Sequence, residues 1–402
     1  MITYNDQQIK AIKECIVWFF TKSHRKRSFV IGGLAGCGKS TIAKVIIGML
    51  GLSDDCVIFV TLTSKASLVL RLKKNPSNTI HKTFYSTYKT KTSFKFTLKK
   101  RIDGNVRLIV IDEMSMVNQK MINDLLSFEV PILGLMDPGQ LPAIFGTNIY
   151  MDNPDLLDVF LTTVMRQSDE SGILDLSQLA RNGEPISMGK YKNSEVTTLD
   201  KVWDKLLEYD VILCWKNSTR RYFNSVIRKL KGYDSVYPVA GEKILCLRNN
   251  YNYEIEYDGV PIYLINGLQG IVISDSKEIK EDDLDLLNLK FTPDFVKDIS
   301  GSTDYTFDVN CFKETFKQYE IDVTKEAFIE IMYDETVDGD TLGNIGMLDY
   351  GYCITVHKSQ GSEWGNVLVL NEYKGSPSNY NRWLYTAITR AKNSVTIVDI
   401  NN

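Results

Sequence analysis

The sequence predicts an α/β protein with two parallel-sheet domains and a small β-rich insertion in the second of them. The first observation is that residues 1–160, and again the chain from Asp210 onward, alternate short apolar runs with helical patterns, as βαβ units do. The second is a change of amino-acid composition between Gly241 and Gly346, a stretch that is rich in Tyr, Asp and Lys. Turn signals at Asp258-Gly259 and Asn266-Gly267 make this stretch hairpin-like.

The elements are assigned from apolar periodicity and from the polar or glycine residues that end each run. In the first domain we expect strands at 29–32, 57–61, 108–112 and 131–137, and a helix over 41–50. In the second we expect a strand at 210–214, a helix over 218–230, and strands at 367–370 and 395–400. Acidic residues in the insertion indicate helical material over 278–287. No internal repeat is visible, although the two α/β domains are candidates for distant copies of one fold.

The composition excludes several classes of protein. With 402 residues, 44% apolar and 24% charged, the chain has the make-up of a globular protein of roughly two to three domains. A net charge of −3 means that any site for a polyanion must be a local basic groove. The seven cysteines form no C-x-x-C pair, which favours reduced thiols, and three histidines are too few for an obvious zinc site. Without a signal-peptide pattern or an apolar run of about 18 residues, we expect a cytoplasmic protein with no membrane partner.

The stretch from Gly33 to Thr41 matches the phosphate-binding loop pattern G-x-x-x-x-G-K-[ST]. It follows an apolar strand-like run and opens a helical one, which is the context that such a loop requires. Its glycines let backbone N–H groups approach phosphates, and the helix N-terminus adds positive potential. We expect Lys39 to bridge the β- and γ-phosphates and Ser40 to bind Mg²⁺. The expected nucleotide-binding residues of the loop are Gly33, Ala35, Gly36, Cys37, Gly38, Lys39, Ser40 and Thr41.

A second nucleotide signal is an apolar run that ends in Asp112 and Glu113. We expect Asp112 to hold Mg²⁺ through water and Glu113 to polarise the attacking water, which favours hydrolysis over transfer to a hydroxyl group. Gln140 follows the strand at 131–137 and is a candidate sensor of the γ-phosphate. A plain turn with Pro-Gly punctuation explains the segment 136–142 equally well.

A series of motifs in order resembles that of the superfamily 1 helicases, specifically the Dda-like and RecD-like branch that moves 5′→3′. The series spans residues 4–391, which is nearly the whole chain. Besides the segments 33–41 and 112–117, it comprises a glutamine motif at 4–11, T-L-T-S-K-A at 61–66, T-I-H-K-T-F at 79–84, D-P-G-Q-L-P at 137–142, L-T-T-V-M-R at 161–166, T-V-H-K-S-Q-G-S-E at 355–363 and Y-T-A-I-T-R-A at 385–391.

The resemblance implies two RecA-like domains, an ATP site in the cleft between them, and DNA as the track. It implies that Gln8 reads adenine, that Glu363 contacts the ribose, and that Arg166 and Arg390 place positive charge on the γ-phosphate. Arginine fingers accelerate phosphoryl transfer by about 10³–10⁵-fold. The DNA contacts that motif position implies are Thr63, Ser64, Lys65, His81, Thr355 and His357. Without the motifs, the two histidines would be interpreted as ordinary core or capping residues.

Residues 89–101 are a local basic segment, with Lys or Arg at six of thirteen positions and no acidic residue. Phe94, Phe96 and Leu98 alternate with polar residues, which is a strand period. The Dda-like family inserts its strand-separating pin at this place, so Phe94 and Phe96 are candidates for base stacking or for wedging the duplex junction. The alternative is an exposed basic hairpin whose phenylalanines pack on the first domain.

The resulting domain division is 1–160 for a first RecA-like domain with the pin at about 85–103, 161–245 and 346–402 for a second, and 246–345 for an SH3-like insertion. The predicted function is a helicase that hydrolyses ATP with Mg²⁺, moves 5′→3′ on single-stranded DNA and unwinds duplex. The alternatives are a translocase that displaces bound proteins with little unwinding, an inactive scaffold and a nucleotide kinase, and RNA stays open as a track. The expected partners are single-stranded and forked DNA, with single-strand-binding or replication proteins as candidates. The expected state is a monomer in the cytoplasm, the host's if the chain is phage-encoded.

Overall fold

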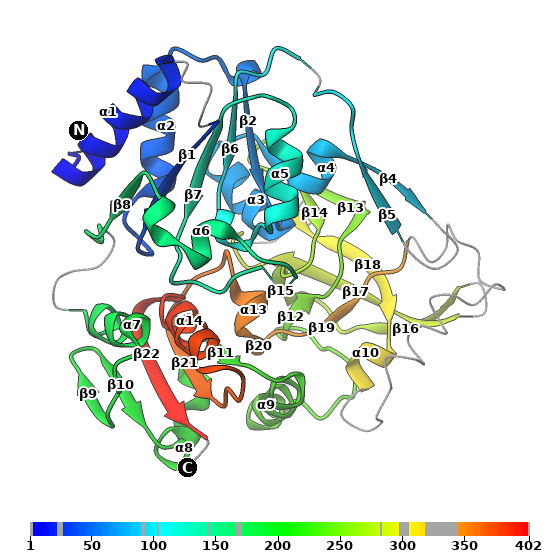
Figure 1. The fold of residues 1–402 in the computed structure, drawn as a ribbon. Coiled ribbons are helices and arrows are strands. Elements are labelled where there is room, and N and C mark those ends of the chain that lie inside the picture. The colour runs from blue at the N-terminus through cyan, green and yellow to red at the C-terminus, as the bar shows by residue number, and fades with distance from the viewer. Residues whose placement is uncertain are drawn as a thin grey trace. The chain divides into compact units, whose positions relative to one another are not determined.

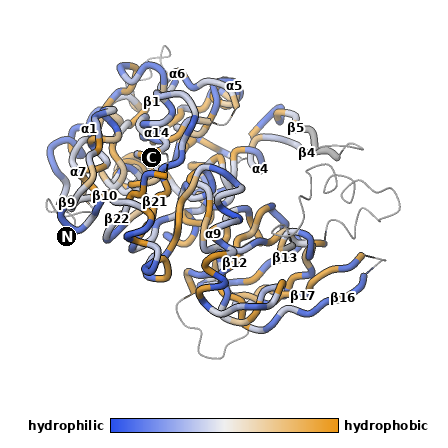
Figure 2. Tube along the Cα trace, turned by 90° about the horizontal axis from the view of Figure 1, so that it is seen from below, coloured by the Kyte–Doolittle hydropathy of each residue, from blue (hydrophilic) through white to orange (hydrophobic). Residues whose placement is uncertain are grey.

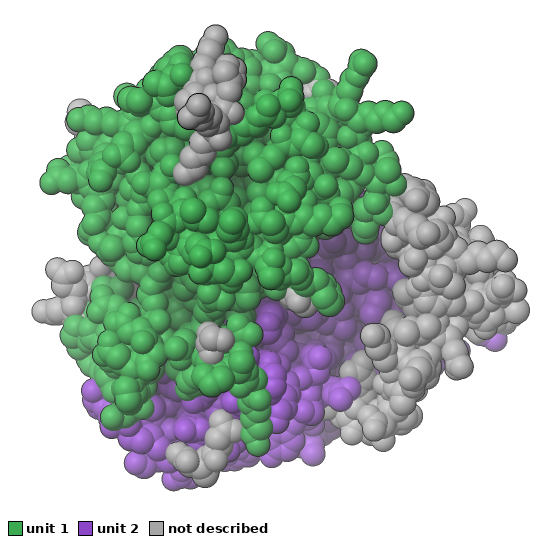
Figure 3. Space-filling view, viewed as in Figure 1, with its two compact units in different colours: residues 1–187, 191–194, 374–389 green, residues 188–190, 195–373, 390–402 purple. Residues whose placement is uncertain are grey.

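The computed structural model describes residues 3–21, 27–89, 94–102, 104–143, 145–165, 171–281, 284–296, 305–317 and 344–400 of the chain. The chain divides into two compact units, each made of several segments (Figure 3). The first comprises 1–187, 191–194 and 374–389, and the second comprises 188–190, 195–373 and 390–402. Helix α14 (Pro377–Ile388) therefore packs with the first unit, although the residues on both sides of 374–389 in the sequence belong to the second.

The first unit contains a parallel sheet with the strand order β3-β2-β6-β7-β1-β8 (Figure 1). The predicted strands at 29–32, 57–61, 108–112 and 131–137 are confirmed, because they correspond to β1, β2, β6 and β7. The strand bounds are β1 Ser28–Gly33, β2 Val57–Thr61, β3 Ser77–Thr79, β6 Leu108–Ile111, β7 Ile132–Met136 and β8 Val159–Leu161.

Helices cover both faces of this sheet, and a hairpin projects from one connection. The helices are α1 Asp6–Phe20, α2 Lys39–Met49, α3 Ser64–Leu72, α4 Ile80–Phe84, α5 Gln119–Leu126 and α6 Ile149–Asp152, with 3₁₀ turns at Asp54–Cys56, Met114–Met116 and Pro154–Leu156. A further helix of this unit, α7 (Gly172–Asn182), packs with α14. Between α4 and β6 the strands β4 (Tyr85–Lys89) and β5 (Phe94–Leu98) pair antiparallel. The predicted hairpin at 85–103 is therefore present, and its role as a pin stays a prediction.

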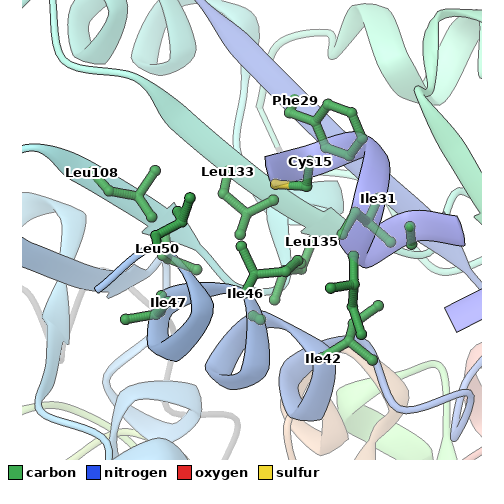
Figure 4. Close-up of a cluster of buried hydrophobic side chains, with 14 of the residues drawn as sticks. Cys15, Phe29, Ile31, Ile42, Ile46, Ile47, Leu50, Leu108, Leu133 and Leu135 are labelled. Carbon is green, nitrogen blue, oxygen red and sulfur yellow. The ribbon is translucent and has the colours of Figure 1, made fainter. Parts of the chain in front are cut away.

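The core of the first unit lies on the two faces of the sheet, and alternate residues of each strand point to opposite sides. Ile31 of β1 packs with Ile42 and Ile46 of α2 and with Cys15 of α1 (Figure 4). The next residue back, Val30, packs on the other face with the apolar residues of α5. Because the strands are buried on both faces, they read in the sequence as continuous apolar runs.

The second unit contains a sheet with the order β20-β11-β21-β22-β10-β9, in which β20, β11, β21 and β22 run parallel. The predicted strands at 210–214, 367–370 and 395–400 correspond to β11, β21 and β22, and the predicted helix at 218–230 is α9. Figure 2 shows the apolar colour along β21. The bounds are β9 Gly189–Tyr191, β10 Ser194–Thr197, α8 Leu199–Val202, a 3₁₀ turn Trp203–Glu208, β11 Val211–Cys214, α9 Asn217–Leu230, β20 Cys353–Thr355, α13 Val356–Ser359, β21 Trp364–Asn371 and β22 Ala391–Asp399.

An antiparallel sheet with the order β16-β17-β15-β12-β19 follows in the same unit, and β18 pairs with β17. A separate hairpin joins β13 to β14. Most of these strands lie in the stretch from Gly241 to Gly346 that the sequence marks as β-rich, but β19 lies beyond it, and β12 precedes the predicted domain boundary at 246 except for its last residue. The bounds are β12 Lys243–Cys246, β13 Asn250–Tyr257, β14 Val260–Leu264, β15 Gln269–Val272, β16 Lys277–Glu281, β17 Leu284–Pro293, β18 Phe307–Phe312, α10 Glu314–Lys317 and β19 Leu348–Tyr350.

Two local predictions for the insertion are corrected. The expected helix at 278–287 is wrong, because its described residues, 278–281 and 284–287, belong to β16 and β17. Leu286 packs with Phe312 and Ile345, and this tertiary pairing outweighs the local preference of acidic residues for a helix. The turn at Asp258-Gly259 does join the hairpin β13–β14, with φ of 53° and 71°. The turn at Asn266-Gly267 connects β14 to β15, which pair with other strands and not with each other.

Buried ion pairs attach the antiparallel sheet to α9. Arg220 pairs with Asp349 of β19, and the Arg228 Nε donates to Glu242 Oε1 at 2.7 Å. Both carboxylates are almost fully buried. All seven cysteines are free, as predicted. Among the described residues, no helix has both the length and the apolar character that crossing a bilayer requires.

Candidate nucleotide and nucleic-acid sites

The phosphate-loop segment lies between the end of β1 and the start of α2, as the sequence predicts. Gly38 caps α2 with φ of 86°, a left-handed conformation that glycine adopts without strain. A Cβ atom on Gly33 would lie 2.7 Å from Cys37 Sγ and 2.9 Å from Leu161 Cβ. A side chain at Gly33 would therefore collide with its neighbours, which keeps the loop backbone free of one there.

The hydroxyl and the carboxylate predicted to hold Mg²⁺ are in direct contact. Ser40 Oγ donates to Asp112 Oδ2 at 2.8 Å, and the backbone N–H of Glu113 donates to Asp112 Oδ1 at 2.9 Å. Oxygen donors of this kind fit Mg²⁺, which takes oxygen ligands and usually keeps several waters. Lys39 Nζ donates to the carbonyls of Gly33 at 2.8 Å and Leu34 at 2.9 Å within its own loop.

Glu113 adopts a backbone conformation that is rare for its residue type. Its φ and ψ are 53° and 43°, in the left-handed region, and it caps the 3₁₀ turn Met114–Met116. Such a conformation costs on the order of 1 kcal/mol or more and persists only where the surroundings impose it. The buried turn that follows therefore sets the direction in which the Glu113 side chain leaves the strand end.

The glutamine motif is fixed by a capping box at the start of α1. The Asn5 side chain accepts from the Gln8 backbone, and the Gln8 side chain accepts from the Asn5 backbone. Gln8 Nε2 also donates to the carbonyl of Cys37 at 3.0 Å, so this buried side chain touches the phosphate loop. Its neighbour Gln7 accepts from the backbone N–H of Thr162 at 2.9 Å, which joins α1 to the L-T-T-V-M-R segment.

Sequence reasoning missed a buried network around Asp137. Tyr385 of α14 donates its hydroxyl proton to Asp137 Oδ2 at 2.7 Å and accepts from the backbone N–H of Ala35 in the phosphate loop at 3.1 Å. Arg181 of α7 donates to Asp137 Oδ1 at 2.8 Å, and so does the backbone N–H of Gly139 at 3.0 Å. Burial, with the adjacent carboxylate, raises the pKa of Tyr385 well above its usual value, so the hydroxyl keeps its proton. The signal available in the sequence was the position of Tyr385 inside Y-T-A-I-T-R-A.

The remaining predicted nucleotide residues are spread over both units. Gln140 is buried, and its backbone N–H donates to the Asp137 carbonyl at 3.1 Å. In the second unit Arg390 is buried with Nη1 3.4 Å from the carbonyl of Ser362. Glu363 lies 3.9 Å from Lys392. Arg166 lies outside the described residues; the residue before it, Met165, donates its backbone N–H to Gly36 at 3.0 Å.

The two T-x-H segments occupy equivalent places in the two parallel sheets. Thr79 ends β3, the edge strand beside β2, and Thr355 ends β20, the edge strand beside β11. Each threonine caps a short helix by accepting from a lysine N–H, at 3.2 Å from Lys82 and 3.4 Å from Lys358. Each hydroxyl therefore keeps its own proton for donation to another acceptor. The structure thus gives each sheet one copy of the same element.

The histidines of these segments are half-buried and uncharged in the neutral range. Burial lowers the pKa of both His81 and His357 below the ordinary value. The His81 ring lies 4.7 Å from that of Phe96 and 5.5 Å from that of Tyr85, measured between centroids. Phe96 is 50% exposed, and the Phe94 side chain lies outside the described part of the chain. The base of the β4–β5 hairpin therefore packs against the first T-x-H segment.

The segment after β2 is more enclosed than the sequence suggests. Thr63 caps α3 by accepting from the Ala66 N–H at 3.2 Å. Ser64 and Lys65 are both buried. The DNA-binding role of these residues stays a prediction.

Lys358 in the second unit is half-buried, and burial lowers its pKa to about 8.

Comparison with known proteins gives two domain matches. Residues 3–200 match the model of an AAA domain, and residues 350–398 match that of a UvrD-like helicase C-terminal domain. An uncharacterised protein of Acanthamoeba polyphaga mimivirus is 25% identical in an alignment 485 positions long, gaps included, that covers 92% of this chain and 95% of that protein. The ATP-dependent RecD2 DNA helicase of Deinococcus radiodurans is 38% identical over 66 residues, which are 16% of this chain and 9% of that protein.

Solved structures share the fold over the whole chain. Pif1 helicase from Candida albicans has a TM-score of 0.52 at 16% identity, covering 100% of this chain and 95% of that one. Bacteroides Pif1 bound to single-stranded DNA has a TM-score of 0.54 at 16% identity, covering 98% and 92%. The predicted fold class, an α/β chain with two RecA-like parallel-sheet domains, is confirmed, and the pin and SH3-like assignments stay predictions.

Proposed function

We propose that this chain, which belongs to the superfamily 1 helicases and has the ATPase activity of that class, moves along single-stranded DNA in the 5′→3′ direction and separates duplex strands. The observation that carries the proposal is the contact of Ser40 with Asp112 beside a phosphate loop, together with one T-x-H element on each parallel sheet. The first part supplies ATP hydrolysis, and the second supplies a grip on the track in each domain.

In the nucleotide site, the phosphate-loop amides and Lys39 bind the phosphates. Lys39 then gives up its hydrogen bonds to the loop carbonyls and donates to the phosphates instead. Ser40 and Asp112 hold Mg²⁺, which supplies charge neutralisation on the phosphates when bound. Glu113 orients the attacking water and takes its proton, while Gln140 senses the γ-phosphate. Gln8 reads adenine and Glu363 the ribose. Residues proposed to contact nucleotide through the loop backbone or side chains are Gly33, Ala35, Gly36, Cys37, Gly38 and Thr41.

Positive charge on the γ-phosphate comes from Arg166 and Arg390 in this proposal. Hydrolysis by water needs charge neutralisation and positioning more than covalent help. Arg390 follows α14 in the chain, and Tyr385 and Thr386 of α14 bond to the phosphate loop and to Leu141, respectively. This chain connection supports a role for Arg390 in the ATP cycle.

On the DNA side, we propose that the hydroxyls of Thr79 and Thr355 donate to phosphate oxygens; the capping bonds that each accepts leave its own proton for this role. His81 and His357, being uncharged, are suited to contact bases and sugars rather than to pair with phosphate. Contacts from Thr63, Ser64 and Lys65, and stacking by Phe94 and Phe96, complete the proposed track. Forked DNA is the proposed substrate, with replication or single-strand-binding proteins as candidate partners.

The finer assignments belong to the same proposal. They comprise the 5′→3′ direction, the Dda-like phage type, a monomeric state in the cytoplasm, and the domain division 1–160, 161–245 with 346–402, and 246–345. The 5′→3′ direction follows from the motif series and from no single residue contact. A translocase that displaces proteins with little unwinding is the alternative that the same test separates.

The test is strand displacement on duplexes with a 5′ tail, a 3′ tail or blunt ends, run beside ATPase assays with and without single-stranded DNA. We expect DNA-stimulated ATPase and unwinding that requires the 5′ tail, and Lys39→Ala should lose both. Unwinding of the 3′-tailed duplex alone would contradict the direction. Strong DNA-stimulated ATPase with negligible unwinding would favour the translocase. ATPase stimulated by RNA but not by DNA would show that the track is RNA and not DNA.

A further inference from the structure

The loops that follow β2 and β11 occupy equivalent places in the two parallel sheets. The last residue of β2, Thr61, pairs with Thr79, and the last residue of β11, Cys214, pairs with Thr355. In both cases the loop therefore lies next to a T-x-H segment. The segment after Thr61 is part of the proposed DNA track, and the segment after Cys214 is its counterpart in the second sheet.

The correspondence extends to the start of the following helix. Thr63 caps α3 two residues after the end of β2, and Lys216 caps α9 two residues after the end of β11. Trp215 and Lys216 thus take in the second sheet the places of Leu62 and Thr63 in the first. No motif considered in the sequence covers this loop.

The second sheet carries an aromatic pair at this place. The Trp215 ring lies 4.7 Å from the Tyr373 ring, with 40° between their planes, and both side chains are partly exposed. Tyr373 follows β21, the strand beside β11. Each aromatic residue is followed by an exposed lysine, Lys216 and Lys374. Aromatic faces for bases beside lysines for phosphates are the combination that proteins use on single strands.

One buried carboxylate fixes the pair. Glu372 Oε1 accepts from the backbone N–H groups of Trp215 at 3.0 Å and Lys216 at 2.8 Å, and Oε2 accepts from Thr219 Oγ1 at 2.6 Å. Glu372 is 7% exposed and directly precedes Tyr373. Both aromatic residues are therefore held in place before a ligand binds, which reduces the ordering cost of binding.

We propose that Trp215 and Tyr373, with Lys216, form a base-stacking site for single-stranded DNA on the second domain. This rests on the proposed function, because it takes a single strand as the ligand. Leu62, at the equivalent place in the first sheet, has no aromatic face. The first domain would then hold the strand at this place by its phosphates, and the second would add a grip on the bases.

The experiment measures equilibrium binding of the full chain to a fluorescein-labelled thymidine oligonucleotide and to an abasic strand of equal length. Trp215→Leu should weaken binding of the thymidine strand by about 5- to 150-fold, the range known for one stacked base, and change abasic binding little. Lys216→Gln should weaken both and reduce the slope of log K against log salt by about 0.7. Tyr222→Ala is the matched control, since Tyr222 is a 56% exposed aromatic residue on α9 and should leave both affinities unchanged.

The outcomes separate this site from the proposed function. A wild-type chain that binds no DNA would overturn the proposed function, whereas wild-type affinity of Trp215→Leu for the thymidine strand would overturn the stacking site alone. If Trp215→Leu does not fold, Trp215→Phe takes its place. It should bind the thymidine strand within about threefold of wild type but lose most of the tryptophan quenching on binding, and quenching of wild-type size would overturn the proposal.

Discussion

The hydroxyl of Tyr385 joins α14 to the phosphate loop, so Tyr385→Phe should destabilise the first unit more than an ordinary buried tyrosine hydroxyl does. The change removes a hydrogen bond to the buried Asp137 carboxylate, and bonds to charged groups contribute about 1.5–3 kcal/mol. It also leaves the Ala35 N–H without this acceptor, which costs about 1–3 kcal/mol where water cannot replace it. We expect a loss of about 2.5–6 kcal/mol in the free energy of unfolding.

Tyr150→Phe is the matched control in the same unit. Its hydroxyl is 2.9 Å from Ser28 Oγ, a neutral pair whose loss should cost about 0.5–1.5 kcal/mol. Urea unfolding followed by tryptophan fluorescence measures both variants, and a double-mutant cycle of Tyr385→Phe with Asp137→Asn isolates the pair. Equal losses for the two tyrosines, or a coupling energy near zero in the cycle, would refute the assignment of Tyr385 as the link.

Three further predictions concern the proposed sites. Glu113→Gln should bind a fluorescent ATP analogue like wild type yet turn over no ATP in a phosphate-release assay, and normal turnover would remove Glu113 as the base. Burial lowers the pKa of Lys358 to about 8 in the folded chain, whereas the ordinary value, which the unfolded chain keeps, is 10.5. Between these two pH values the folded chain has lost the proton and the unfolded chain still binds it. Stability should therefore rise with pH across that window relative to Lys358→Met, as urea unfolding at pH 7 and pH 10 would show, and parallel behaviour of the two proteins would contradict it. Phe96→Ala should slow unwinding of a forked duplex far more than DNA-stimulated ATPase, and equal effects on both would mean that the ring only packs against His81.

The nucleotide site could be predicted from the sequence because its chemistry is local. A phosphate loop needs glycines at fixed spacing between a strand and a helix, and the carboxylates Asp112 and Glu113 stand at the end of an apolar run. Parallel strands then place that strand end beside the loop, as the contact between Ser40 and Asp112 confirms.

Other features depend on tertiary contacts that no short window contains. The bonds of Tyr385 join segments that are 350 and 248 residues apart in the chain. The described residues of the acidic stretch, 278–281 and 284–287, form strands because β16 pairs with β17 and β17 pairs with β18, which the local pattern does not reveal. The Trp215 and Tyr373 pair likewise arises only when β11 and β21 become neighbours.

The two ion pairs on α9 bear on how this chain can be recombined with its relatives. Arg220 and Arg228 lie on α9, whereas their partners lie at the two ends of the segment that forms the antiparallel sheet, just outside the predicted insertion 246–345: Glu242 precedes β12, and Asp349 belongs to β19. Removing one partner of a buried pair costs about 3–5 kcal/mol, because the other charge is left unpaired. A chimera that exchanges the insertion must therefore cut outside 242–349, or supply both carboxylates with the incoming segment. The two ion pairs, and not the length of the connecting loops, therefore determine where this segment can be exchanged.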